Sequence, residues 1–235
     1  MEKENDYPTV FIAGDSTAAV KEEHEKPMTG WGAYIHKFLQ KEVNIRNHAI
    51  NGRSTKSFID EGRLNKLSNE LKAGDFLLIQ FGHNDQKKED PKRYAAFDKE
   101  YKENLTQFVE TARKKGASPV LLTSVTRRVF LEEYKIDPNS LGKYPESTRD
   151  VADELQVPLL DIHHSSMIRF QSMGEEESKE CFLHLDKNIY SNYPDGLIDD
   201  THFSEKGAEL VANLVAEQLK ESISPLGKYL IDKSK

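Results

Sequence analysis

Hydrophobic positions along the chain fall into short apolar runs separated by longer amphipathic segments. Five of the short runs are rich in β-branched and aliphatic residues and are bounded by turn residues, which is typical of buried strands. These runs are 10–14, 43–50, 75–82, 119–125 and 157–163. Because they are apolar almost throughout, they predict a parallel sheet that is covered on both faces.

Two long segments between or after these runs have helical periodicity. Over 96–115 the apolar face consists of Phe97, Tyr101, Leu105, Phe108, Val109 and Ala112, and Gly116 follows as a C-cap residue. Over 204–222 the apolar face consists of Ala208, Val211, Leu214, Val215 and Leu219, with Ser204 as the N-cap. Both segments therefore predict amphipathic helices that pack against the sheet.

Shorter helices are predicted over 31–41, 63–72, 146–156 and 164–173, whereas 174–200 is predicted to be an irregular surface loop. Strands that alternate with helices favour right-handed crossover connections. The sequence therefore predicts an α/β fold, a three-layer α/β/α sandwich with a five-stranded parallel sheet. At 235 residues the chain is expected to form a single domain over 1–235.

Composition narrows the class of protein further. Cys181 is the single cysteine, so no disulfide can form within the chain. The N-terminus MEKENDYPTV is charged where a signal peptide would be apolar, so we expect a cytoplasmic protein. No apolar run approaches the roughly 18 residues of a membrane span. A membrane is therefore not an expected partner. The net charge is −7 and basic residues are scattered among acidic ones, so nucleic acid is not an expected partner either.

Polar clusters follow the predicted strands at the points where each strand ends. Ligands of open α/β sheets bind beyond the carboxyl ends of the strands, so these clusters should meet at one edge. The clusters are Gly14-Asp15-Ser16-Thr17, the segment 48–54, Gly82-His83-Asn84-Asp85, and Thr126-Arg127-Arg128. A fifth cluster, Asp199-Asp200-Thr201-His202, precedes the last helix.

The clusters contain the parts that a serine hydrolase needs. Ser16 can supply the hydroxyl, His202 can accept its proton, and Asp199 can orient the imidazole from three residues away on the same turn. A helix N-terminus at Ser16, the backbone N–H of Gly52 and the amide of Asn84 can donate to an oxyanion. Each residue alone could equally be a turn, cap or surface residue, and only their convergence at one edge of the sheet predicts a catalytic site.

The same blocks resemble the SGNH, or GDSL-type, hydrolase family. Its signature is a Ser after Gly-Asp, a Gly after the second strand, an Asn in Gly-x-Asn-Asp and a His in Asp-x-x-His, and all four occur here in order. The resemblance implies a flavodoxin-like fold, Ser16 as nucleophile, His202 as base and Asp199 as its partner. It also implies an oxyanion hole made of Ser16, Gly52 and Asn84. We expect neither a cofactor nor a metal. Asp15 and Asp85 would then brace loops.

Within that family, GDST, GHND and DDTHFS are similar to the blocks of rhamnogalacturonan acetylesterases. This resemblance implies an acetylated pectic oligosaccharide or polysaccharide as substrate. Arg127 and Arg128 could then meet uronate carboxylates, and Tyr190 and Tyr193 could form a sugar platform. Solvated or ion-paired arginines and packed tyrosines remain the alternatives. His83 is expected to be a neighbouring polar residue without a catalytic role.

Other functions share part of this pattern. An acetylxylan esterase, a lipase or a thioesterase would present the same blocks. GHND resembles a metallophosphoesterase block, but His and Asn are exchanged and the later histidine motif is missing. No Gly-x-Ser-x-Gly elbow of an α/β-hydrolase and no nucleotide-binding glycine motif follows a predicted strand. A non-catalytic carbohydrate-binding module on the same scaffold is the alternative from a different class.

Overall fold

The computed structural model describes residues 7–231 and has a five-stranded parallel sheet at its centre. The strands are β1 (Thr9–Gly14), β2 (Asn44–Asn47), β3 (Phe76–Gln80), β4 (Ser118–Leu122) and β7 (Leu159–Leu160). Their order across the sheet is β2-β1-β3-β4-β7. The α/β/α prediction and all five predicted strands are confirmed.

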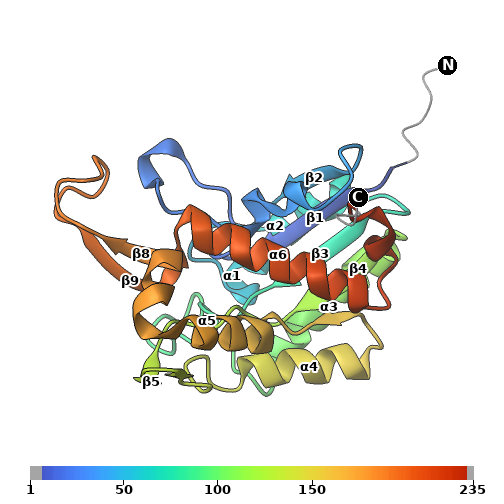
Figure 1. The fold of residues 1–235 in the computed structure, drawn as a ribbon. Coiled ribbons are helices and arrows are strands. Elements are labelled where there is room, and N and C mark those ends of the chain that lie inside the picture. The colour runs from blue at the N-terminus through green and yellow to red at the C-terminus, as the bar shows by residue number, and fades with distance from the viewer. Residues whose placement is uncertain (1–6, 232–235) are drawn as a thin grey trace.

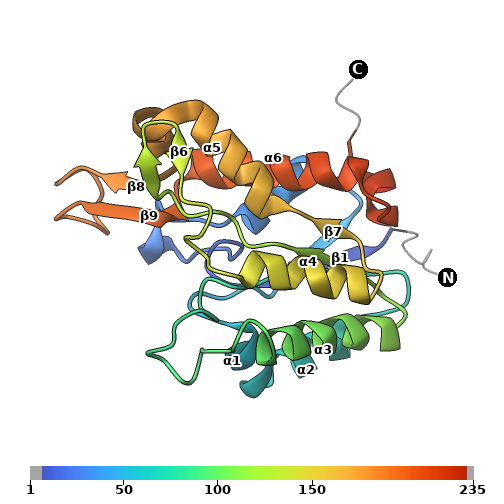
Figure 2. The same ribbon diagram turned by 90° about the horizontal axis from the view of Figure 1, so that it is seen from below.

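Helices cover both faces of this sheet, as Figure 2 shows. They are α1 (Thr55–Asp60), α2 (Arg63–Glu70), α3 (Glu100–Lys114), α4 (Tyr144–Glu154), α5 (Ile162–Ser178) and α6 (Glu205–Glu221). Helices α5 and α6 lie on one face and α1 to α4 on the other. The predicted cap of α6 is confirmed, because the Ser204 side chain accepts a hydrogen bond from the Gly207 N–H.

Alternation along the strands explains this two-sided core. Successive side chains of a strand point to opposite faces. Val10 and Ile12 of β1 therefore pack in the cluster that includes α6, while Phe11 and Ala13 pack in the cluster that includes α3. A strand buried on both faces is apolar at every position, which is why the sequence showed continuous runs.

Several segments differ from the sequence-based predictions. The helix N-terminus expected at Ser16 is wrong, because residues 16–18 form a turn after β1 and no helix begins there. The predicted helix over 31–41 is two 3-10 turns, η2 (Trp31–Ala33) and η3 (Ile35–Lys37). Helix α1 was not predicted, because only six residues form it. The predicted loop 174–200 is also wrong: α5 continues into it past a kink at Gly174, and most of the remainder is a hairpin.

The hairpin consists of two antiparallel strands, β8 (Phe182–Leu185) and β9 (Leu197–Phe203), which project from the body of the molecule (Figure 1). Its base is packed, because the rings of Phe182 and Phe203 lie 5.4 Å apart and both are buried. A second pair of short strands, β5 (Phe130–Glu132) and β6 (Lys135–Ile136), lies between β4 and α4 in the sequence. The remaining 3-10 turns are η1 (Glu23–Glu25), η4 (Lys179–Cys181) and η5 (Pro225–Tyr229).

Candidate active site

The turn after β1 lies where the strand order reverses. Strand β1 lies between β2 and β3, so the chain leaves it at the topological switch point where α/β proteins bind ligands. Asp15 builds the turn: its Oδ1 accepts hydrogen bonds from the Thr17 N–H at 2.9 Å and the Thr17 hydroxyl at 2.8 Å. The expectation that Asp15 braces this loop is confirmed, and the turn holds Ser16 at the carboxyl edge of the sheet.

Ser16, His202 and Asp199 form a continuous hydrogen-bonded chain. The Ser16 Oγ lies 2.9 Å from His202 Nε2, and His202 Nδ1 lies 2.7 Å from Asp199 Oδ2. Partial burial raises the pKa of the Asp199 carboxyl, but hydrogen bonds from His202 and the Thr201 N–H outweigh burial and hold that pKa well below its usual range. An ionised carboxylate only accepts hydrogen bonds, so Nδ1 carries the proton and Nε2 is free to accept the Ser16 proton.

Asp199 and His202 meet because β9 leaves the ladder between them. Asp199 pairs with Leu183, and Phe203 pairs with Phe182. The three residues between Asp199 and Phe203 therefore form a bulge in β9, while the partners of Asp199 and Phe203 on β8 are adjacent in sequence. Asp199 Oδ1 accepts hydrogen bonds from the N–H groups of Thr201 at 2.8 Å and His202 at 3.0 Å. The pair thus needs no other element to meet, as the sequence predicted, although it lies in a strand.

Two backbone N–H groups near Ser16 are free to bind an anion. The N–H groups of Ser16 and Gly52 have no hydrogen-bond partner within residues 7–231. Gly52 follows β2 with a φ of +72°, which favours glycine. The Asn84 amide is oriented by the Arg53 carbonyl, to which its Nδ2 donates at 3.1 Å, and by Arg93 Nη1, which donates to its Oδ1 at 3.4 Å.

One pocket of about 360 Å³ brings these groups together. Its lining is Ser16, Met28, Asn51, Gly52, His83, Asn84, Lys87, Arg93, Arg127, Asp199, Thr201 and His202. All five residues that the sequence analysis singled out as catalytic or oxyanion-binding line it. Such an arrangement can deprotonate a serine hydroxyl and stabilise an oxyanion beside it.

Asp85 and His83 of the GHND block make contacts that support the neighbouring loops. Asp85 accepts hydrogen bonds from the N–H of Thr55 at 2.9 Å and from its hydroxyl, which ties the block to the start of α1. Burial raises the pKa of Asp85 to about 7 despite these bonds. His83 is buried, and its Nδ1 donates to Asp15 Oδ2 at 3.2 Å. The expected bracing role of Asp85 is confirmed, and His83 supports the Ser16 turn through Asp15.

The two consecutive arginines have different surroundings. Arg127 lines the pocket, where its Nη1 donates to the Thr201 hydroxyl at 2.6 Å. Arg128 turns away and is 5 % exposed: it donates to Asp200 Oδ1 at 2.7 Å, to the Ser178 hydroxyl and to the Glu175 carbonyl. Arg128 is therefore an anchor between β9 and α5, and its expected place in the substrate site is wrong.

The expected sugar platform is also displaced from the pocket. Tyr193 donates from its hydroxyl to the Glu25 carbonyl at 2.8 Å, and Tyr190 pairs with it in a turn at the end of the hairpin. Neither residue lines the pocket that contains Ser16.

Sequence reasoning missed Lys87 and Arg93, which add positive charge to the pocket. Lys87 has no carboxylate within 4.0 Å of its ammonium group among residues 7–231, and nor has Arg127. Burial lowers the pKa of Lys87, and the charges of Arg93 and Arg127 lower it further. The signal available in the sequence was position: Lys87 follows Asn84 by three residues and begins a pair of lysines.

The family model described as GDSL-like Lipase/Acylhydrolase matches residues 10–215, which include every residue of the candidate site. The chain belongs to this family. The hydrolase is 46 % identical over 224 residues to rhamnogalacturonan acetylesterase RhgT of Bacillus subtilis, covering 95 % of this chain and 94 % of the relative. It is 35 % identical to the probable rhamnogalacturonan acetylesterase YesY of the same organism, covering 94 % and 97 %.

A solved structure supports the fold assignment. The crystal structure of protein YxiM from Bacillus subtilis has a TM-score of 0.77 and 25 % identity to the hydrolase, covering 92 % of this chain and 56 % of that chain. The hydrolase is thus a carboxylic ester hydrolase of the SGNH type. Within residues 7–231 no helix is long and apolar enough to cross a membrane, and no group of three or more His, Cys, Asp or Glu side chains could hold a metal ion.

Proposed function

We propose that this hydrolase is a serine acetylesterase that removes acetyl groups from rhamnogalacturonan or its oligosaccharides. The observation that carries the catalytic part is the chain of hydrogen bonds from Ser16 through His202 to Asp199, with Ser16 facing a pocket. The substrate part rests on the similarity to RhgT and on the chemistry of the pocket wall.

The reaction proceeds through an acetyl-enzyme. His202 Nε2 takes the Ser16 proton as Oγ bonds to the acetyl carbonyl carbon, and the N–H groups of Ser16 and Gly52 with the Asn84 amide hold the oxyanion. The bond to the sugar oxygen then breaks, and His202 returns the proton to that oxygen. Water repeats the sequence on acetyl-Ser16 and releases acetate.

The pocket wall supports a polar substrate over a lipid. Met28 is the one hydrophobic side chain in the lining, among the residues that the structure describes. A lipase site would be lined by several hydrophobic side chains, since about 0.8 kcal/mol is gained for each CH₂ of an acyl chain that is buried. Lys87 and Arg127 instead offer charge to an anionic sugar.

Acetate release from a panel of esters tests the proposal. Acetylated rhamnogalacturonan oligosaccharides, acetylxylan, a long-chain p-nitrophenyl ester and an acyl thioester are compared with wild-type enzyme and Ser16→Ala. We expect preference for the first substrate and loss of turnover by several orders of magnitude in the variant. Preference for acetylxylan, the long-chain ester or the thioester would overturn the substrate assignment.

The same variant separates an enzyme from a binding module. A fluorophosphonate should label wild-type protein stoichiometrically and Ser16→Ala not at all, since it reacts with an activated serine. Equal labelling of the two proteins would exclude Ser16 as the nucleophile.

The contribution of Lys87 to substrate binding can be tested with the neighbouring Lys88 as a matched control. Lys87 lines the pocket, whereas Lys88 is exposed and does not. Lys87→Met should raise KM for acetylated uronate oligosaccharides about tenfold and leave the hydrolysis of neutral p-nitrophenyl acetate within about twofold, because one charged hydrogen bond is lost. Lys88→Met should change neither. Equal effects of the two variants would remove the carboxylate role of Lys87.

A further inference from the structure

A buried lysine outside the proposed catalytic groups lies directly behind the nucleophile. Lys21 is 7 % exposed, and its Nζ donates a hydrogen bond to the Ser16 carbonyl at 2.6 Å and another to Asn51 Oδ1. No carboxylate lies within 4.0 Å of Nζ among residues 7–231. Burying an ammonium group costs free energy unless its protons are used, so these two acceptors account for its position.

The two acceptors belong to the two loops that carry the free N–H groups. Ser16 lies after β1, and Asn51 precedes Gly52 after β2. The Lys21 side chain therefore connects the residue that bears one oxyanion donor to the residue next to the other. The Asn51 carbonyl, which belongs to the same peptide unit as the Gly52 N–H, accepts a hydrogen bond from Arg53 Nη1 at 3.0 Å.

Asn51 is held on its other side by an acidic residue of η1. Its Nδ2 donates to Glu25 Oε1, and Glu25 Oε2 accepts from the Glu22 N–H at 3.1 Å. The Asn51 amide is thus fixed by Lys21 at its oxygen and by Glu25 at its nitrogen. Burial lowers the pKa of Lys21 to about 8, against the charges of Glu25 and Asp15, so the ammonium form prevails at neutral pH.

We propose that Lys21 is a positioning residue that sets the distance between the Ser16 and Gly52 N–H groups of the oxyanion hole. This inference rests on the proposed function, since it takes Ser16 as the nucleophile and the Ser16 and Gly52 N–H groups as oxyanion donors. The ammonium group touches no reacting atom and acts through the two loops. Because oxyanion donors work only when they are aimed at the developing charge, a shift between the loops raises the barrier of the chemical step.

This role predicts a loss in kcat rather than in substrate binding. Lys21→Met keeps an unbranched side chain and removes both hydrogen bonds. We expect kcat for p-nitrophenyl acetate to fall about 10- to 100-fold with KM within about twofold, because the lost stabilisation appears only in the transition state. The rate of phosphonylation by diethyl p-nitrophenyl phosphate, which also develops an oxyanion, should fall in parallel with kcat.

A stability control separates positioning from loss of structure. Val215→Ala removes a buried methyl pair from α6, outside the pocket lining, and should destabilise the fold without changing kcat or the phosphonylation rate of the folded enzyme. If Lys21→Met behaves like Val215→Ala, with wild-type kcat in the folded fraction, Lys21 has a structural role only and the proposal is overturned.

A second variant keeps the test usable if Lys21→Met does not fold. Asn51→Ala cuts the same bridge at its other end and should also lower kcat with little change in KM. The double variant should be no slower than Lys21→Met, since both changes remove one link. A wild-type kcat for Asn51→Ala, or fully additive losses, would contradict the bridge. Turnover by Ser16→Ala would instead reject the proposed nucleophile, so the two failures are distinguishable.

Discussion

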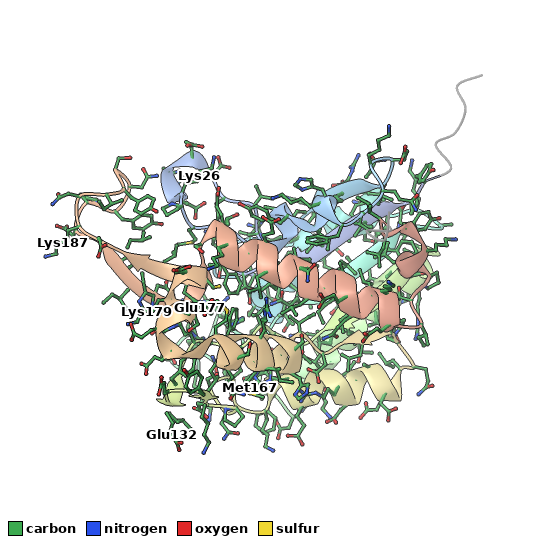
Figure 3. The ribbon with its side chains drawn as sticks, in the orientation of Figure 1. Lys26, Glu132, Met167, Glu177, Lys179 and Lys187 are labelled. Atoms are coloured by element: carbon green, nitrogen blue, oxygen red, sulfur yellow. The ribbon has the colours of Figure 1, made fainter. Side chains whose placement is uncertain are left out.

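The nucleophile and the base belong to two different parts of the fold, the central sheet and a separate hairpin. Ser16 follows β1, a central strand whose residues from Val10 to Ala13 are buried. His202 belongs to the β8–β9 hairpin, which lies outside the main sheet and extends away from it (Figure 1). Figure 3 shows Lys187 at the projecting end of this hairpin, far from the sheet. One half of the catalytic pair is thus fixed by the core, and the other half is on an appended element.

Beyond its packed base at Phe182 and Phe203, the hairpin is held against the rest of the molecule by polar contacts. Asp200 Oδ1 accepts hydrogen bonds from Arg128 Nη1 and from His184 Nε2, each at 2.7 Å. The Thr29 N–H donates to the Phe203 carbonyl at 3.1 Å, and Asn192 donates to carbonyl groups of the η1 loop at 2.9 Å. The 2.9 Å contact between Ser16 and His202 therefore depends on directional bonds that single substitutions can remove.

The largest expected effect comes from breaking the contact between the two regions. His202→Ala should lower kcat by about 10⁴-fold or more, because Ser16 then has no base. The double variant with Ser16→Ala should be no slower than either single variant, since the two residues act as a unit. Kinetics on p-nitrophenyl acetate measure this, and additive losses would mean that the two regions contribute independently.

A smaller loss of kcat is expected when a donor beside the central sheet is removed and the hairpin is left intact. Asn84→Ala removes one oxyanion donor and should lower kcat about 10²- to 10³-fold, while the Ser16–His202 contact stays in place. Fluorophosphonate labelling should still occur, only more slowly. A kcat within threefold of wild type would show that the Asn84 amide does not donate to the oxyanion.

The anchor of the hairpin should matter more for stability than for chemistry. Arg128→Met leaves Asp200 with His184 as its remaining partner and should cost about 2 kcal/mol of unfolding free energy, less than a fully buried pair because Asp200 is 39 % exposed at its side chain. Arg127→Met, its neighbour, should cost less than about 1 kcal/mol. Urea denaturation compares the two, and equal losses would contradict the assignment of Arg128 as the anchor.

The same contrast explains what the sequence could and could not reveal. The central strands and helices α3 and α6 were predictable, because burial on the sheet imposes a period on local residues. Ser16, Gly52 and Asn84 followed from the rule that strand ends share one edge. Asp199 and His202 were found because a short-range turn joins them.

Contacts distant in sequence account for what was missed. The hairpin is stabilised where Phe182 and Phe203 pack, and neither residue's surroundings can be read from its own segment. Which of Arg127 and Arg128 enters the pocket is decided by Asp200, which lies 72 residues beyond Arg128. Lys21 resembles a surface lysine in a charged stretch, and only the meeting of two loops makes it a buried one.

The smallest expected effect is a difference in how the two regions respond to pH. Asp199, on the hairpin, has a pKa held below its unfolded value near 3.8, so it stabilises the fold above about pH 4 and loses that contribution as pH falls further. Asp85, beside the sheet, has its pKa raised to about 7, so the folded state retains its proton longer than the unfolded chain. Its contribution therefore declines as pH rises from about 4 to 7.

Substitution of each aspartate by asparagine should separate their opposite effects on how stability changes with pH. Asp199→Asn should lose less stability than wild type between pH 5 and pH 3, whereas Asp85→Asn should lose less between pH 5 and pH 7, because each variant lacks the group that titrates in that interval. Urea midpoints across pH 3 to 7 measure both. Parallel curves for wild type and Asp85→Asn would mean that burial beside Thr55 does not disfavour the charged form of the Asp85 carboxylate.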